Sequence, residues 1–213
     1  MILKRTYRQR VAFGLKQGLR RAEASTLADL KTSSDIQDFV SALHINHERG
    51  GHSLKSVQST LAHRNAHCIE GAFVAATALW MAGAPPLLMD LQAKNDSDHV
   101  VTLFKHGSCW GAISRSNHVW LRWRDPVYRN LRELAMSYFH EYTNDRGQKT
   151  LRTYSRPFDL RRLPLDQWLL GDDDCWEAGA ALDDARHYPL VTPAQAKHLK
   201  MRDALELKAD RLR

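Results

Sequence analysis

The clearest feature in the pattern of apolar and polar positions is a long apolar stretch from Ile69 to Met81. It is longer than a typical strand, and Gly83 follows it as a stop signal, so the pattern predicts a helix. The polar residues 64–67 that precede it indicate a turn. Cys68 therefore stands where a polar turn gives way to an apolar helix.

Shorter patterns predict further elements. Asp125-Pro126 and Thr192-Pro193 each combine a capping side chain with a proline suited to the first turn of a helix. Helices are predicted at residues 34–47, 53–62, 125–142 and 194–213, with short helical pieces at 166–168 and 176–182. Strands are predicted at residues 87–91, 98–104, 109–113 and 151–154. The second and third strands form a hairpin around Gly107.

Residues 1–24 form a basic arm for which an amphipathic helix is predicted. Seven basic residues precede the first acidic one, Glu23, and the rest of the chain has 24 basic and 24 acidic residues, so the arm accounts for the net charge of +7. The arm either docks on an anionic partner, such as membrane lipid or nucleic acid, or packs on the domain and faces residues 172–174. Packing is favoured, and a nucleic-acid partner is not expected because the body is neutral. Its apolar residues recur every four positions: Leu3, Tyr7, Val11, Leu15 and Leu19.

The composition is that of a soluble globular protein, with 43% hydrophobic and 26% charged residues in 213. We expect the arm, a single domain over residues 25–190 and a charged C-terminal helix over residues 191–213. No apolar run approaches the ~18 residues of a transmembrane segment. Three cysteines are too few for a disulfide framework, which favours a reducing compartment and a cytoplasmic protein.

Cys68 and His99 are the candidate reactive residues. Unpaired N–H groups and the positive end of the macrodipole at a helix start lower a cysteine pKa and favour the thiolate. His99 stands near the start of the strand predicted at residues 98–104. A cysteine on a helix followed by a histidine on a strand is the chain order needed for thiol-based acyl transfer. We therefore expect Cys68 as nucleophile and His99 as base.

The segment around these two residues resembles the transglutaminase-like superfamily of papain-type thiol enzymes, which place Cys, His and an acid in this chain order. It is also similar to the arylamine N-acetyltransferases, whose Arg-x-x-x-Cys-x-Glu pattern is matched by Arg64, Cys68 and Glu70. The resemblance covers roughly residues 53–118. It implies an α+β fold in which the cysteine-bearing helix packs on a small antiparallel sheet, with extra helices at both ends. It also implies a buried contact between Arg64 and Glu70.

The sequence departs from the family at the acid that orients the histidine. The family has Trp-x-x-x-Asp on the next strand, whereas Trp110 is followed at that spacing by Ser114. Ser114 and Asn117 are the candidates for this role, and Asn117 is preferred because its amide oxygen can accept from an imidazole. The Cys68 backbone N–H is the expected oxyanion donor, with Asn65 or His67 as a candidate second donor. The candidate substrate-binding residues are Asn65, His67 and Trp110.

Two further clusters suggest other chemistry. One contains zinc-ligand types, but it lacks a His-Glu-x-x-His pattern, so neither a metal nor a cofactor is expected. Its members are His63, His67, Cys68 and His99. The other is a basic and aromatic rim that could bind an anionic or aromatic group, although such arginines more often lie on a solvated surface. Its members are Arg122, Arg124, Arg129 and Arg132, with Trp120 and Trp123.

Three functional hypotheses follow. The first is a thiol enzyme that acts on a peptide or a small acyl or amide substrate through a Cys68 thioester. The second is a catalytically impaired member of the same fold that binds a peptide or protein. The third is a protein that docks on anionic surfaces through its basic arm.

Overall fold

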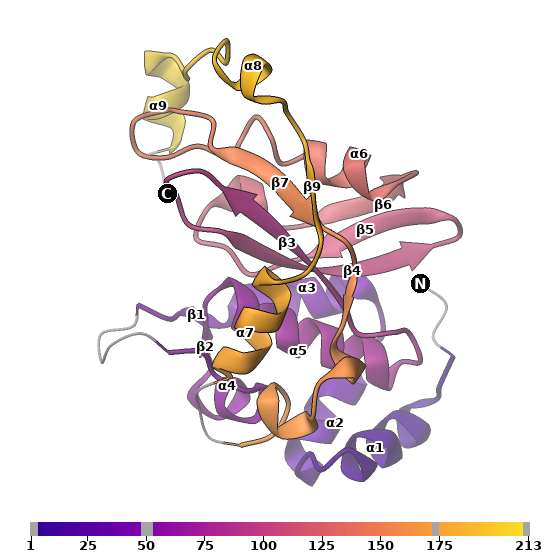
Figure 1. Cartoon of the computed structure of the whole chain (residues 1–213). Coiled ribbons are helices and arrows are strands. Elements are labelled where there is room, and N and C mark those ends of the chain that lie inside the picture. The colour runs from indigo at the N-terminus through magenta and orange to yellow at the C-terminus, as the bar shows by residue number, and fades with distance from the viewer. Residues whose placement is uncertain (1–3, 48–52, 172–174, 211–213) are drawn as a thin grey trace.

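A seven-stranded sheet lies between two sets of helices in the computed structural model, which describes residues 4–47, 53–171 and 175–210 (Figure 1). The helices are α1 (Tyr7–Lys16), α2 (Arg21–Asp29), α3 (Ser33–Ala42), α4 (Val57–His63), α5 (Cys68–Met81), α6 (Leu131–Met136), α7 (Trp176–Asp183), α8 (Pro193–Ala196) and α9 (Ala204–Asp210). The strands are β1 (His44–Ile45), β2 (Asn65–Ala66), β3 (Leu87–Ala93), β4 (His99–His106), β5 (Cys109–Ile113), β6 (Arg124–Tyr128), β7 (Leu151–Ser155), β8 (Phe158–Asp159) and β9 (His187–Pro189). This arrangement confirms the α+β class.

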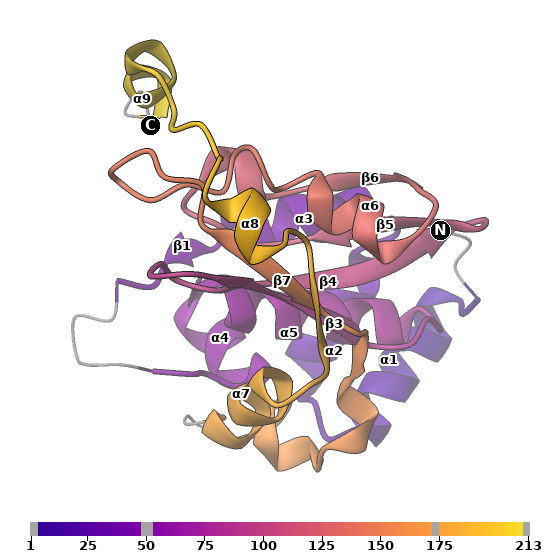
Figure 2. The ribbon, with the colours of Figure 1, turned by 45° about the horizontal axis from the view of Figure 1, so that its top comes forward.

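The large sheet is antiparallel and runs in the order β6-β5-β4-β3-β7-β9, while β8 pairs with β3. The predicted hairpin is β4–β5, in which Thr102 pairs with Ile113. Short strands β1 and β2 form a separate parallel pair. Figure 2 shows α4, α5 and α7 below the sheet, and Figure 1 shows α6 above β5 and β6. The sheet therefore has a core on each face.

The predicted apolar helix is α5, and it is the centre of the larger core. A helix that is apolar all round is stable only when it is enclosed, and α5 is buried on nearly every side. Helices α1 to α4 pack around it, and β4 crosses its sheet-facing side. The Thr102 hydroxyl donates to the Ala72 carbonyl at 2.8 Å, which ties β4 to the first turns of α5. This contact brings the start of β4 close to the start of α5.

The helix predicted at residues 125–142 is wrong at both ends, since only Leu131–Met136 are helical. Residues 124–128 form the edge strand β6, which pairs with β5, and α6 begins only at Leu131 after the Asn130 cap. Pro126 has no N–H to donate, and an edge strand tolerates this because one side of its backbone remains unpaired. The aromatic residues expected on the helix are buried in the second core: Tyr138, Phe139 and Tyr142.

The arm is also different from the single helix that was predicted. Gly18, with φ of 95°, ends the segment after α1, and α2 follows. Helix α1 packs against α2 and α5, and the buried Arg10 donates through Nη1 to the Leu30 carbonyl at 2.8 Å. Tyr7 and Leu15 of the predicted apolar stripe are exposed, whereas Val11 and Leu19 are buried. Leu3 and residues 172–174 lie outside the described residues.

The final helix predicted at residues 194–213 is divided. Helix α8 ends at Ala196 and α9 begins at Ala204, so the seven residues 197–203 between them belong to neither helix. Residues 211–213 lie outside the described part of the chain. The segment has few buried apolar side chains, and this agrees with two short helices rather than one long packed helix.

Gly71 allows the sheet to approach the first turn of α5, and its replacement gives a stability test. A Cβ at Gly71 would lie 2.5 Å from the Arg115 Cβ, so Gly71→Ala should lower the free energy of unfolding by about 1–3 kcal/mol. Gly179→Ala in α7 is the matched control, because its nearest neighbour is the mobile end of Leu54 at 3.0 Å. Denaturant unfolding that shows equal stability for both variants would contradict this close packing.

Candidate functional site

The start of α5 is fixed by a buried carboxylate. Glu70 is fully buried and accepts hydrogen bonds from the backbone N–H of His67 at 2.9 Å and of Lys55 at 2.9 Å. The Lys55 ammonium lies 3.3 Å from Glu70 Oε2, the oxygen that also accepts from His67, and balances the charge of the carboxylate. Because Glu70 holds His67 as the N-cap, the next residue, Cys68, is the first residue of α5. Its thiol is half-buried at the helix start.

The ring of His67 is oriented by backbone and carboxylate oxygens. Its Nε2 lies 2.8 Å from the Ser53 carbonyl and 3.5 Å from the Glu70 carboxylate. A carbonyl oxygen can only accept, so Nε2 carries a proton. Nδ1 is then the ring nitrogen that remains for the hydrogen bond with the Cys68 thiol. His67 is therefore a direct partner of Cys68.

The ring of His99 is oriented in the same way from the opposite element. Its Nε2 lies 2.9 Å from the Leu121 carbonyl and 3.1 Å from the Ser114 hydroxyl. The Ser114 hydroxyl itself donates to the Leu121 carbonyl at 2.7 Å, so its lone pairs face the imidazole. Nε2 is thus the protonated nitrogen, and Nδ1 is left to contact the Cys68 thiol. His99 is 5% exposed, which limits competition from water.

These two imidazoles control the charge of Cys68. Burial alone would raise the pKa of the thiol, but hydrogen bonds from His67 and His99, together with their charges, lower it to about 5. Burial would lower the pKa of His67, yet the hydrogen bond to Cys68 and the charges of Glu70 and Cys68 raise it to about 9. At neutral pH the pair is therefore a thiolate beside an imidazolium, which is the reactive form of a thiol.

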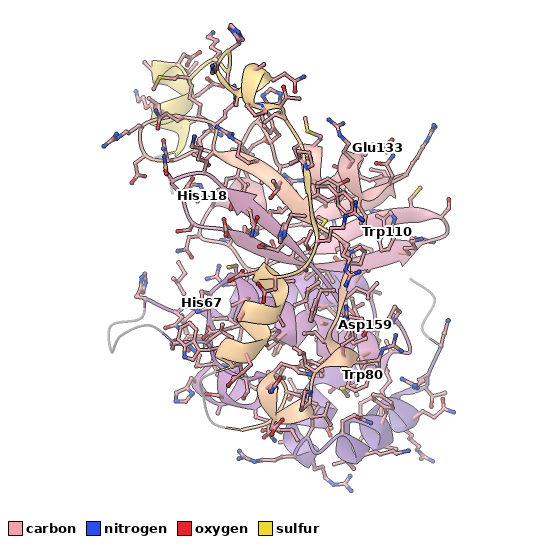
Figure 3. The ribbon with its side chains drawn as sticks, in the orientation of Figure 1. His67, Trp80, Trp110, His118, Glu133 and Asp159 are labelled. Atoms are coloured by element: carbon pink, nitrogen blue, oxygen red, sulfur yellow. The ribbon has the colours of Figure 1, made fainter. Side chains whose placement is uncertain are left out.

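Cys68 and His99 open into a pocket of about 610 Å³. Sequence reasoning missed several residues of its wall, because they come from separate segments that only the tertiary fold brings together. Figure 3 shows His67 and His118 on the same side of the molecule. The residues that line the pocket without having been predicted include Arg115, Ser116, His118, Leu121, Tyr142 and Trp176.

The structure brings only some of the predicted site residues together. Cys68, His67, His99 and Ser114 are in contact, as described above. Asn117 lines the pocket and is exposed, but it makes no hydrogen bond with His99, so Ser114 takes the position beside the imidazole. Neither Asn65 nor Trp110 lines this pocket. Trp110 is on the opposite side of the view from His67 in Figure 3 and packs under the Lys105 ammonium.

One expectation about a basic residue is corrected, and the cluster of arginines and tryptophans lies outside the pocket. Arg64 does not reach Glu70; it is exposed at the end of α4 with φ of 53°, and Lys55 is the cationic partner of the buried carboxylate. The predicted arginine rim does not line the pocket either. Arg124, for example, has a structural role, because it donates to Ser137 Oγ at 2.9 Å and lies 3.9 Å above the Tyr138 ring.

Comparison with known proteins identifies no family: no family model matches the sequence, and no curated protein is significantly similar to it. The resemblance to transglutaminase-like enzymes therefore stays an expectation from the sequence motifs around Cys68 and His99. Within the described residues, no helix is long and apolar enough to cross a membrane. In the same part of the chain, no three His, Cys, Asp or Glu side chains gather in a way that could hold a metal ion.

The charge state of Cys68 predicts selective alkylation. Thiolate is lost as the pH falls through the pKa, so Cys68 should still react with iodoacetamide at about pH 6 and become slow only below about pH 5. Cys109 lies in the hairpin, and the burial of Cys175 limits its access to the reagent. Mass spectrometry of timed reactions would measure each rate. Equal rates for the three cysteines at this pH would contradict the assignment.

Proposed function

We propose that this protein is a cysteine-dependent enzyme that cleaves or transfers an acyl or amide group through a thioester on Cys68, on a transglutaminase-like core. The observation that carries the proposal is the placement of the thiol at the start of α5, between His67 and His99 and inside a pocket. Thiol acyl transfer needs a nucleophile, a base and a group that orients the base.

Acylation would begin with attack of the Cys68 thiolate on the substrate carbonyl carbon. The backbone N–H of Cys68 is in the first turn of α5 and has no intrahelical acceptor, so it can donate to the developing oxyanion. The His67 N–H cannot serve, because it already donates to Glu70. The proton that the Cys68 thiol gives up to Nδ1 of His99 would then pass to the leaving amine or alcohol. A C–S bond forms and the C–N or C–O bond breaks, leaving a thioester.

Deacylation would return the enzyme to its starting state. His99 Nδ1 takes a proton from water or from an acceptor nucleophile, which attacks the thioester and releases the Cys68 thiolate. The Leu121 carbonyl and the Ser114 hydroxyl keep Nε2 protonated throughout, as a carboxylate would in the related families. A carbonyl stabilises the imidazolium less than a charged carboxylate does. The second imidazole, His67, offsets this difference by stabilising the thiolate.

The alternative is a peptide- or protein-binding module on the same fold. The absence of an acid after Trp110 favours it, since Ser114 holds that position. The half-open pocket beside Cys68 would then serve as a binding groove. The two functions differ in one respect: only the enzyme forms and releases a covalent acyl group.

An acyl donor of simple structure, p-nitrophenyl acetate, tests the enzyme directly. The wild-type protein should release p-nitrophenolate and show an acetyl group on Cys68 by mass spectrometry, and Cys68→Ser should show neither. His99→Gln should slow deacylation by about 10²-fold or more, so that the acetylated form accumulates. Deacylation needs His99 as a base. Acylation by this ester does not need His99 as an acid, because the leaving phenolate needs no proton.

His67→Gln is the matched control for charge. It removes one imidazole beside the thiol and should raise the pKa of Cys68 and slow acylation at neutral pH, while deacylation through His99 continues. A wild-type protein whose Cys68 never carries an acetyl group would favour the binding module. Equal deacylation in wild type and His99→Gln would contradict the role of His99.

A further inference from the structure

A second charged feature of the pocket is a buried arginine without an acidic partner. Arg115 follows β5 and is 4% exposed. Buried arginines are normally paired with a carboxylate, because an isolated buried charge is costly. Arg115 forms no ion pair with any residue in the described part of the chain. Its charge is therefore open to a ligand.

The contacts of Arg115 aim its guanidinium without neutralising it. Nε donates to the Leu43 carbonyl at 3.2 Å, and Nη1 donates to the Ser116 carbonyl at 2.9 Å. Nη2 has no acceptor among residues 4–47, 53–171 and 175–210. It is not one of the fully buried side-chain atoms that lack a hydrogen-bond partner, so part of its surface is exposed. Nη2 is therefore accessible, and the cavity that Arg115 lines is this pocket.

The position of Arg115 places this charge beside the nucleophile. Its Cβ lies against Gly71, in the first turn of the helix that begins with Cys68. Arg115 and Cys68 line the same pocket. A molecule that occupies this pocket can therefore meet both the guanidinium and the thiol.

Neighbouring charges favour an anion at this point. Burial lowers the pKa of Arg115, the charge of Arg122 lowers it further, and no carboxylate raises it. Asp96 and Asp98 line the pocket from the segment between β3 and β4, where they accept from Thr150 Oγ1 and the Ala93 N–H, each at 2.7 Å. These aspartates repel an anion from their side, so the pocket is polarised toward Arg115.

We infer that Arg115 binds a carboxylate of the substrate, and that the substrates are acidic acyl or amide compounds whose carboxylate lies a few atoms from the reacting carbonyl. This inference rests on the proposed function, because it assigns the substrate class of the Cys68 site. Arginine suits the role, since its planar fork donates two parallel hydrogen bonds to a carboxylate.

Two alkylating reagents that differ in one group provide the test. Iodoacetate carries a carboxylate, and iodoacetamide is its neutral counterpart. The rate with iodoacetate divided by the rate with iodoacetamide should be higher at Cys68 than for glutathione by about tenfold or more, the factor expected for a charge-assisted hydrogen bond. Taking the ratio removes any change in the thiol pKa, because both reagents attack the same thiolate.

Variants separate Arg115 from the general charge of the site. Arg115→Gln should lower the ratio at Cys68 by about tenfold, and Arg115→Lys should retain part of it. Arg129→Gln, an exposed arginine outside the pocket, removes the same charge and should leave the ratio unchanged. Circular dichroism and thermal melts verify folding. A purely structural Arg115 would alter both rates alike and leave the ratio unchanged.

A measurement on the wild-type protein keeps the test valid if Arg115→Gln does not fold. Succinate should slow alkylation of Cys68 by iodoacetamide, and succinamide, its neutral diamide, should not. A glutathione-like ratio without protection by succinate overturns the carboxylate site while Cys68 stays reactive, so the proposed function stands. A Cys68 that reacts with neither reagent overturns the proposed function, and the carboxylate site with it.

Discussion

The constraint on which this site depends is the burial of the Glu70 carboxylate. A buried charge must be paired and hydrogen-bonded, and Glu70 meets this need by joining the Lys55 ammonium, two backbone N–H groups and the Asn46 amide. These partners come from the start of α5, from the residues before α4 and from the end of β1. The same carboxylate lies beside the His67 ring and favours its charged form. Glu70 therefore contributes both to the packing at the start of α5 and to the electrostatics at Cys68.

The sequence predicts the elements with strong periodicity and fails where tertiary pairing decides. Helix α5 and the β4–β5 hairpin are confirmed, because a long apolar run and two strands around Gly107 admit few alternatives. The Asp125-Pro126 pair was misinterpreted, since its capping chemistry is local, whereas pairing with β5 makes the same residues an edge strand. The four-residue spacing of apolar residues in the arm predicts one helix, but Gly18, with its positive φ, separates α1 from α2.

The site was predicted in part for a related reason. Cys68 and His99 have local signals, at a helix start and a strand start, and the structure brings them together. The group that orients His99 includes the Leu121 carbonyl, and a backbone atom leaves no signature in the sequence. The cation that pairs with Glu70 was sought at Arg64, within the local motif, but it is Lys55 from an earlier segment. Arg115 belongs to no sequence motif. Only the structure indicates that it can bind a ligand, because it is buried without a carboxylate partner.

The central claim is that the Cys68 thiol is ionised at neutral pH by its two imidazole neighbours. Its most direct test is the ultraviolet absorbance of the thiolate, recorded for wild type and for Cys68→Ser across a pH series, with the difference assigned to Cys68. The account predicts a single titration with a midpoint at about 5. A midpoint at about 8.5, the value of an unperturbed thiol, would contradict it.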